Sequence, residues 1–265
     1  FRPIATPPPE SGFHIDVRFT GGLSDAQQAA FETAAARWGR IVSADVPAVV
    51  IDGETIDDVR IDAAGEQIDG PGSILGQAGP IELRPGTFIP ATGIMSFDSA
   101  DLEQMEQDGS LVSVIVHEMG HVLGFGTIFD RVDLIMGAGG PDPEFTGENA
   151  TREYAALLGA GARPASVPLA NVGGPGMRDG HWREEVFGNE LMTGFLDTGA
   201  NPISRLTIGA FEDLGYTVDY AAADAYRLPT ADELITLQTV HAQRGHDCII
   251  EIPEQHVLPE SALVD

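Results

Sequence analysis

Two histidines four residues apart in an apolar segment constrain this chain more than any other feature. His117 and His121 enclose Glu118 in the run His-Glu-Met-Gly-His, which follows the apolar residues 112–116. On a helix, side chains four positions apart lie on one face, so two imidazoles can bind one zinc ion in tetrahedral geometry. Glu118 can then reach a water on the metal and act as its general base. Two incidental histidines on a surface helix are the alternative, but a buried imidazole pair beside a carboxylate is costly unless a metal satisfies it.

Apolar periodicity around this motif predicts a mixed α+β chain. Capping boxes at Ser24/Gln27 and Thr230/Glu233 mark two helix starts, and Ser110 is expected to cap the helix that carries the histidines. Helices are predicted at 25–43, 111–123, 147–158, 204–215 and 231–243. Strands are predicted at 14–20, 49–51, 59–61, 81–83 and 88–97, whereas 245–265 has no clear type. A mixed sheet beside the first helix is the most economical arrangement.

Composition excludes several classes of partner. The chain has 265 residues, a net charge of −27 and 14 basic residues, all of them arginine. Nucleic acid is therefore an unfavourable partner, as is an anionic membrane surface. No apolar run approaches the roughly 20 residues that cross a bilayer, so no membrane span is expected. The acidity indicates a well-solvated surface or a preference for cationic peptides.

Neither cysteine usage nor the start of the chain fixes the compartment. Cys248 is the one cysteine, so no intrachain disulfide can form. The chain opens on a Pro-rich segment without a signal peptide, which we interpret as a processed start. From the expected chemistry we predict a secreted, monomeric protein.

The motif leaves the third metal ligand open. A catalytic zinc normally has three protein ligands and one open position. Gly124 allows the helix to end and the chain to turn, which is how the metzincin pattern begins. That pattern would put the third ligand at position 127, where this chain has Thr127, a poor zinc ligand. The remaining candidates are the histidines at 14, 181, 241, 246 and 256 and the carboxylates Asp130 and Glu190.

The segment 180–194 resembles the leishmanolysin family of metzincins. His181 begins the run His-Trp-Arg-Glu-Glu, and residues 189–194 read Asn-Glu-Leu-Met-Thr-Gly. That family inserts a segment between the glycine and the third histidine, and has a methionine-containing turn soon after it. The resemblance spans about 13–228 and implies that His181 is the third ligand and that Met192 forms the apolar floor of the site. The chain lacks the many cysteines of eukaryotic members, so it looks more like a compact bacterial relative.

The resemblance also implies an architecture, that of a metzincin-like zincin. Residues 1–124 would form an N-terminal subdomain with a twisted mixed sheet and two helices, the second of them the active-site helix. Residues 125–228 would form an irregular subdomain with the third ligand and the methionine turn, and 229–265 a helix and tail. The active-site cleft would lie between the two subdomains. Ile94, Met95 and Ser96 would lie on the edge strand above it, where an extended peptide adds by β-augmentation, although an interior strand is the alternative.

The expected function is that of a zinc-dependent endopeptidase, which hydrolyses peptide bonds of extended polypeptides with Glu118 as base. Three alternatives stay open: a zinc hydrolase with a different third ligand, a non-proteolytic adhesion or binding module, and a form held latent by its tail. In the latent form Cys248 could bind the metal, although a buried free thiol is favoured for this residue. Calcium could bind the acidic clusters Asp130/Asp133, Asp142/Glu144 and Asp197/Asn201, although none has the spacing of a known loop. Tyr216 and Tyr220 could stabilise a tetrahedral intermediate, but core or surface roles are favoured.

Overall fold

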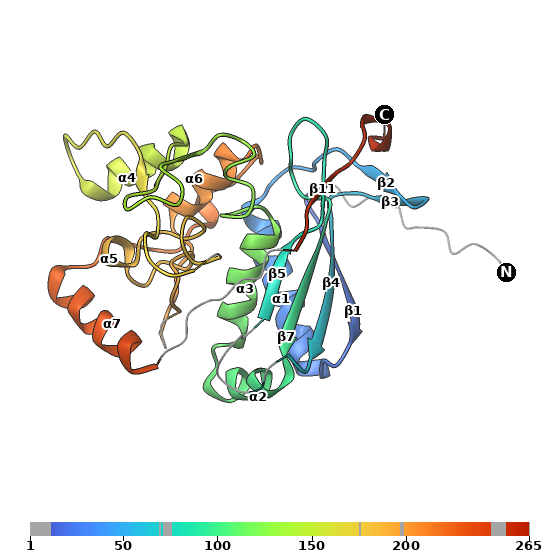
Figure 1. The fold of residues 1–265 in the computed structure, drawn as a ribbon, viewed down its shortest axis with the longest axis horizontal. Coiled ribbons are helices and arrows are strands. Elements are labelled where there is room, and N and C mark those ends of the chain that lie inside the picture. The colour runs from blue at the N-terminus through green and yellow to red at the C-terminus, as the bar shows by residue number, and fades with distance from the viewer. Residues whose placement is uncertain are drawn as a thin grey trace.

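The computed structural model describes residues 12–68, 70, 76–174, 176–196, 199–244 and 253–264. Its main sheet has four strands in the order β1-β4-β7-β5 (Figure 1). These are β1 (Ile15–Gly21), β4 (Val59–Glu66), β7 (Thr92–Asp98) and β5 (Gly76–Pro80). Strands β1, β4 and β7 run parallel, and β5 pairs antiparallel with β7. The expected mixed sheet is therefore present.

Within the described ranges, three smaller sheets lie outside the main one. The pair β2 (Val49–Ile51) and β3 (Glu54–Ile56) forms a hairpin, and β6 (Glu82–Leu83) pairs parallel with β11 (His256–Val257). A three-stranded sheet joins β8 (Ile135–Met136), β9 (Glu144–Phe145) and β10 (Val167–Pro168). The strands predicted near 49–51 and 81–83 thus form, but neither belongs to the main sheet.

The predicted edge strand is an interior strand. In β7, Ile94 pairs with Asp62 of β4 on one side and with Gly79 of β5 on the other, and Met95 and Ser96 are likewise paired on both sides. Its backbone groups are already committed to the sheet, so an extended peptide cannot add to it. The edge-strand prediction for these residues is therefore wrong, and the outermost strand on this side is β5.

Three helices accompany the sheet, one more than predicted. Helix α1 (Asp25–Ile41) begins with the expected Ser24/Gln27 capping box and packs against β1 and against α3 (Leu111–Val122). Helix α3 in turn contacts β5 and β7. The additional helix is α2 (Ser99–Asp108). Two details of α3 differ from expectation: Ser110 is the N-cap residue but makes no side-chain cap hydrogen bond, and Val112 is 40% exposed.

Short elements and loops make up the other half of the molecule. The helices there are α4 (Glu148–Leu158), α5 (Glu184–Phe187), α6 (Arg205–Asp213) and α7 (Ala231–Arg244), with the 3-10 turn η1 (Tyr220–Ala222). A second 3-10 turn, η2 (Glu260–Ala262), contacts β2 in the N-terminal half. Figure 1 shows α4–α7 on the side of α3 that faces away from the sheet. Helix α3 therefore stands between the two halves.

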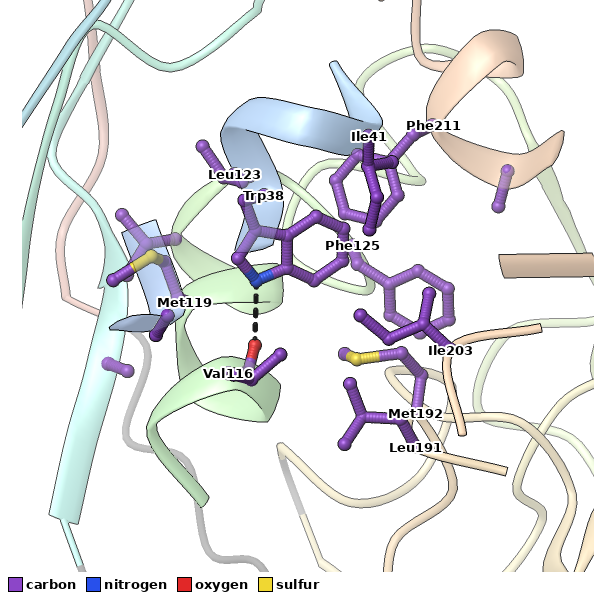
Figure 2. Close-up of a cluster of buried hydrophobic side chains, with 14 of the residues drawn as sticks. Trp38, Ile41, Val116, Met119, Leu123, Phe125, Leu191, Met192, Ile203 and Phe211 are labelled. Atoms are coloured by element: carbon purple, nitrogen blue, oxygen red, sulfur yellow. Dashed lines mark hydrogen bonds between the residues drawn. The ribbon is translucent and has the colours of Figure 1, made fainter. Parts of the chain in front are cut away.

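One hydrophobic core joins these halves, and Trp38 lies in it (Figure 2). The Trp38 indole N–H donates to the carbonyl of Val116 in α3 over 2.9 Å, and its ring lies 4.6 Å from that of Phe211 in α6, measured between centroids. Helix α1 thus contacts both α3 and α6 through Trp38. The boundaries at 124 and 228 stay predictions, since core side chains come from both sides of residue 124.

Candidate metal centre

Helix α3 presents both of its histidines to the interior. His117 and His121 have no exposed surface, and their Nε2 atoms lie 3.0 Å apart. The helix forms because its sequence is apolar apart from the motif, and it is buried from Val114 to Val122. The i, i+4 spacing therefore places the two imidazoles side by side, as predicted.

The turn after α3 engages the Thr127 hydroxyl at the end of the helix. Gly124 and Gly126 have φ of +111° and +72°, which L side chains rarely adopt, and there the chain reverses direction. The Thr127 hydroxyl donates to the carbonyl of His121 over 2.8 Å and so caps the end of the helix. A Cβ on Gly126 would lie 2.2 Å from the carbonyl oxygen of Gly180, so this glycine permits the close approach of the segment that contains His181.

His181 completes a three-histidine cluster. Its Nε2 lies 3.2 Å from that of His117 and 3.1 Å from that of His121, and the residue is fully buried. Among the described residues this is the one group of three or more potential metal ligands. The residue that the resemblance implied thus lies beside the two that the motif identified.

Backbone carbonyls fix the tautomer of all three rings. The Nδ1 atoms of His117, His121 and His181 lie 2.6, 2.8 and 3.1 Å from the carbonyl oxygens of Leu191, Phe125 and Met177, respectively. A carbonyl only accepts, so each Nδ1 carries the proton, and each Nε2 of a neutral ring keeps its lone pair.

Electrostatics favour a bound cation. Burial lowers the pKa of His117 to about 4, that of His181 to about 3, and that of His121 well below its usual value. Three neutral nitrogens therefore face one another with no proton between them. Ligands of tetrahedral zinc, at about 2.05 Å from the metal, lie roughly 3.3 Å apart. The observed spacing of 3.0–3.2 Å and the donor set fit zinc.

Glu118 and Met192 are both buried, one on helix α3 and one against it. Glu118 follows His117 in α3 and is 6% exposed. Met192 is fully buried beneath the helix, where a Cβ on Gly120 would lie 3.0 Å from its sulfur (Figure 2). The helix can approach the methionine this closely because residue 120 is glycine. The roles of Glu118 as base and of Met192 as floor stay predictions.

The other candidate ligands lie elsewhere. Asp130 is exposed, and Glu190 binds backbone and hydroxyl groups away from the cluster. Asp142 forms an ion pair with Arg183. Cys248 and Asp197 lie outside the described residues. Within the part of the chain that the structure describes, no second group of ligands supports a calcium site.

Both tyrosines make structural contacts. The buried hydroxyl of Tyr216 donates to the carbonyl of Leu123 over 2.9 Å. The Tyr220 hydroxyl donates to Glu212 over 2.7 Å, and its ring lies beneath the guanidinium of Arg205. These contacts agree with the favoured core and surface roles.

Sequence reasoning missed the backbone groups that orient the three histidine rings. The carbonyls of Leu191, Phe125 and Met177 are backbone atoms, so the identity of these residues carries no signal of their role. The buried carboxylate of Glu190 was considered only as a ligand. A signal was available in Gly126, since a second glycine just after the helix indicates another close backbone approach.

Comparisons with known proteins point to one family. A family model described as leishmanolysin matches residues 86–233. A leishmanolysin homolog from Crithidia fasciculata is 30% identical over 145 residues, which are 52% of this chain and 22% of that protein. A leishmanolysin from Leishmania donovani is 28% identical over 143 residues, 51% of this chain and 24% of that protein. The chain thus matches about a quarter of the length of these relatives.

Proposed function

Because the chain belongs to the leishmanolysin family, whose model matches more than half of it, we propose that it is a zinc-dependent endopeptidase with His117, His121 and His181 as metal ligands. The observation that carries this proposal is the convergence of three buried Nε2 lone pairs within 3.2 Å. Each Nδ1–H is bound to a backbone carbonyl, the arrangement that orients imidazole ligands in metal sites. His181 is therefore the third ligand in this proposal, rather than a carboxylate.

Glu118 supplies the proton transfer. Zinc in such a site lowers the pKa of its water and polarises a carbonyl oxygen. The Glu118 carboxylate accepts the proton that water gives up as it attacks the scissile carbonyl. Glu118 then delivers this proton to the leaving amine, which ends the cycle with the carboxylate ionised. Its location directly after His117, on a helix that Trp38 anchors, keeps the base at a fixed distance from the ligands.

The proposed substrates are proteins and extended peptides, and the enzyme is proposed to act outside the cell as a monomer. A net charge of −27 disfavours nucleic acid as a partner. Among the described residues, no helix is long and apolar enough to span a bilayer. The outer edge of β5 replaces β7 as the strand to which an extended peptide could add, because β5 ends the sheet.

Cleavage of end-blocked peptides tests the endopeptidase proposal. Peptides with an acetylated N-terminus and an amidated C-terminus resist exopeptidases but remain substrates for an endopeptidase. We expect internal cuts in such a library by mass spectrometry, their loss after metal removal with a chelator, and their return with added zinc. A protein that binds zinc but cuts nothing in the library would instead be a latent form or an adhesion or binding module.

A further inference from the structure

A buried carboxylate, that of Glu190, binds the turn that contacts one histidine of the cluster. Glu190 has no exposed surface, and its Oε1 accepts hydrogen bonds from the Ser204 N–H over 3.0 Å, the Ser204 hydroxyl over 2.7 Å and the Thr207 hydroxyl over 2.5 Å. Its Oε2 accepts from the N–H of Met192 over 2.7 Å. These donors are uncharged, and none of the ion pairs among the described residues includes Glu190. A carboxylate without a cation is costly to bury, so its retention needs an explanation.

One peptide group connects this carboxylate to a metal ligand. The N–H of Met192, which Glu190 binds, and the carbonyl of Leu191 are opposite ends of the same planar peptide unit. That carbonyl accepts the Nδ1–H of His117 over 2.6 Å, the shortest of the three ligand-orienting contacts. The Glu190 carboxylate, the Leu191–Met192 peptide group and the His117 imidazole thus form one hydrogen-bonded chain. Hydrogen bonds in such a chain polarise one another, and an anion at the N–H end makes the carbonyl a stronger acceptor.

A second branch of the same network reaches the segment of His181. The indole N–H of Trp182 donates to the Thr207 hydroxyl over 2.8 Å, and that hydroxyl donates to Glu190. The backbone N–H of Trp182 donates to the carbonyl of Met192 over 2.9 Å. This branch holds the residue after His181 through a neutral hydroxyl, whereas the branch to His117 acts on the ligand through a single peptide group.

We propose that Glu190 is a positioning residue of the metal site, which fixes the direction and raises the donor strength of His117 through the Leu191–Met192 peptide group. The inference rests on the proposed function, since it presupposes that His117 binds a metal. In this proposal the Glu190 carboxylate increases metal affinity, in addition to holding the turn around Met192 in place. Loss of a partner that orients a ligand typically weakens metal binding by about 10–100-fold.

The test is the zinc affinity of Glu190→Gln, measured by competition with a chromophoric chelator, together with the visible spectrum of the cobalt-substituted protein. Glutamine has the same shape but offers one oxygen and one NH₂ group. Whichever way it turns, the NH₂ faces an N–H or O–H that the carboxylate accepted. We expect zinc affinity to fall by about 10–100-fold and the cobalt spectrum to change.

Thr207→Val is the matched structural control. It breaks the link between Trp182 and Glu190 but leaves the bond from Glu190 to Met192 intact. A positioning role predicts that Thr207→Val lowers the melting temperature while zinc affinity stays within about threefold of wild type, a small fraction of the outer-shell effect. Equal weakening in the two variants, in proportion to lost stability, would overturn the proposal. The exposed Glu185→Gln removes one charge nearby and should leave affinity unchanged.

If Glu190→Gln does not fold, Glu190→Asp takes its place in the test. The aspartate keeps the negative charge, but its side chain is one methylene shorter and so falls short of the Met192 N–H. This variant should bind zinc more weakly than wild type. Wild-type affinity and an unchanged cobalt spectrum in the folded variant, Gln or Asp, would refute the role of Glu190 alone. Failure of the wild type to bind zinc or cobalt would instead refute the proposed function, and the inference with it.

Discussion

At the scale of single residues, His181 is the ligand on which the proposed metal site most depends. It approaches the other two histidines from a different segment, and its ring is held by the carbonyl of Met177. We predict that His181→Ala loses zinc affinity by at least about 100-fold, more than the loss of an outer-shell partner. The measurement is zinc content after dialysis, with chelator competition. His14→Ala removes an exposed histidine outside the cluster and should behave as wild type.

A result in which His181→Ala holds zinc as tightly as wild type would place the third ligand elsewhere. The nearby carboxylates do not fit that role well, because Asp130 is exposed and Glu190 is engaged with Ser204 and Met192.

The residues of the proposed site differ in how well the sequence alone predicts them. His117 and His121 follow from helical geometry alone, because four residues separate them. His181 lies 60 positions beyond His121, and no periodicity relates residues on different segments. His181 was predicted from the resemblance to a known family. The Leu191 carbonyl and the carboxylate beneath it could not be predicted, since hydrogen bonds to a peptide group leave little trace in composition.

At the scale of elements, helices α4 and α6 pack closely against each other at Gly209. Helix α6, which begins after Ser204, crosses α4 there, and a Cβ on Gly209 would lie 2.9–3.0 Å from backbone atoms of Asn149 and Ala150. Backbone atoms cannot move aside as a flexible side chain can. Any side chain at this position would therefore push the two helices apart.

We predict that Gly209→Ala destabilises the protein by about 1–2 kcal/mol in urea unfolding. Overpacking costs roughly 1–3 kcal/mol, and the better helix propensity of alanine offsets up to about 1 kcal/mol of it. In the control Gly39→Ala on α1, the new Cβ would meet one atom, the Phe13 carbonyl oxygen at 3.3 Å, so the change should be closer to neutral. A more stable Gly209→Ala would contradict this account of the helix crossing.

Elements were predicted well where periodicity was strong. Helices α1 and α3 lie within two residues of their predicted bounds because each has a continuous apolar face. Strand β5, Gly-Gln-Ala-Gly-Pro, was missed because glycine and proline are depleted in strands. Helix α2 was missed because most of its residues are polar, and Leu102 and Met105 are its only buried apolar side chains. With β5 unseen, β7 was taken for the edge of the sheet.

At the scale of the whole molecule, the segment 253–264 lies on the N-terminal half, although α7 precedes it on the opposite side (Figure 1). The His256 and Leu258 N–H groups donate to carbonyls of residues 81 and 83, and Gln255 donates to the carbonyl of Thr127, just after α3. Ala262 is buried in a small cluster with Val49, Ile56 and Ala91. These contacts therefore attach the segment 253–264 to the N-terminal half of the molecule.

We predict that truncation after Arg244 lowers the melting temperature by on the order of 5 °C, because this cluster and these hydrogen bonds are lost. Differential scanning calorimetry at equal zinc saturation measures the effect, and an unchanged melting temperature would contradict it.

The same truncated variant tests whether the C-terminal tail holds the protein in a latent form. A Cβ on Gly79 of β5 would lie 2.5 Å from Pro253, so the segment adjoins the outermost strand, and a higher cleavage rate after truncation would indicate that it obstructs peptides.

The central claim is that one buried site both binds zinc and hydrolyses peptide bonds with Glu118 as base. The most direct test compares zinc content and casein cleavage in wild type and Glu118→Gln. We predict about one zinc per chain in both proteins and cleavage that is about 10²–10⁴-fold slower in the variant, because proton transfer is lost while the three histidines remain. Wild-type cleavage by the variant, or a wild-type protein without zinc, would contradict the account.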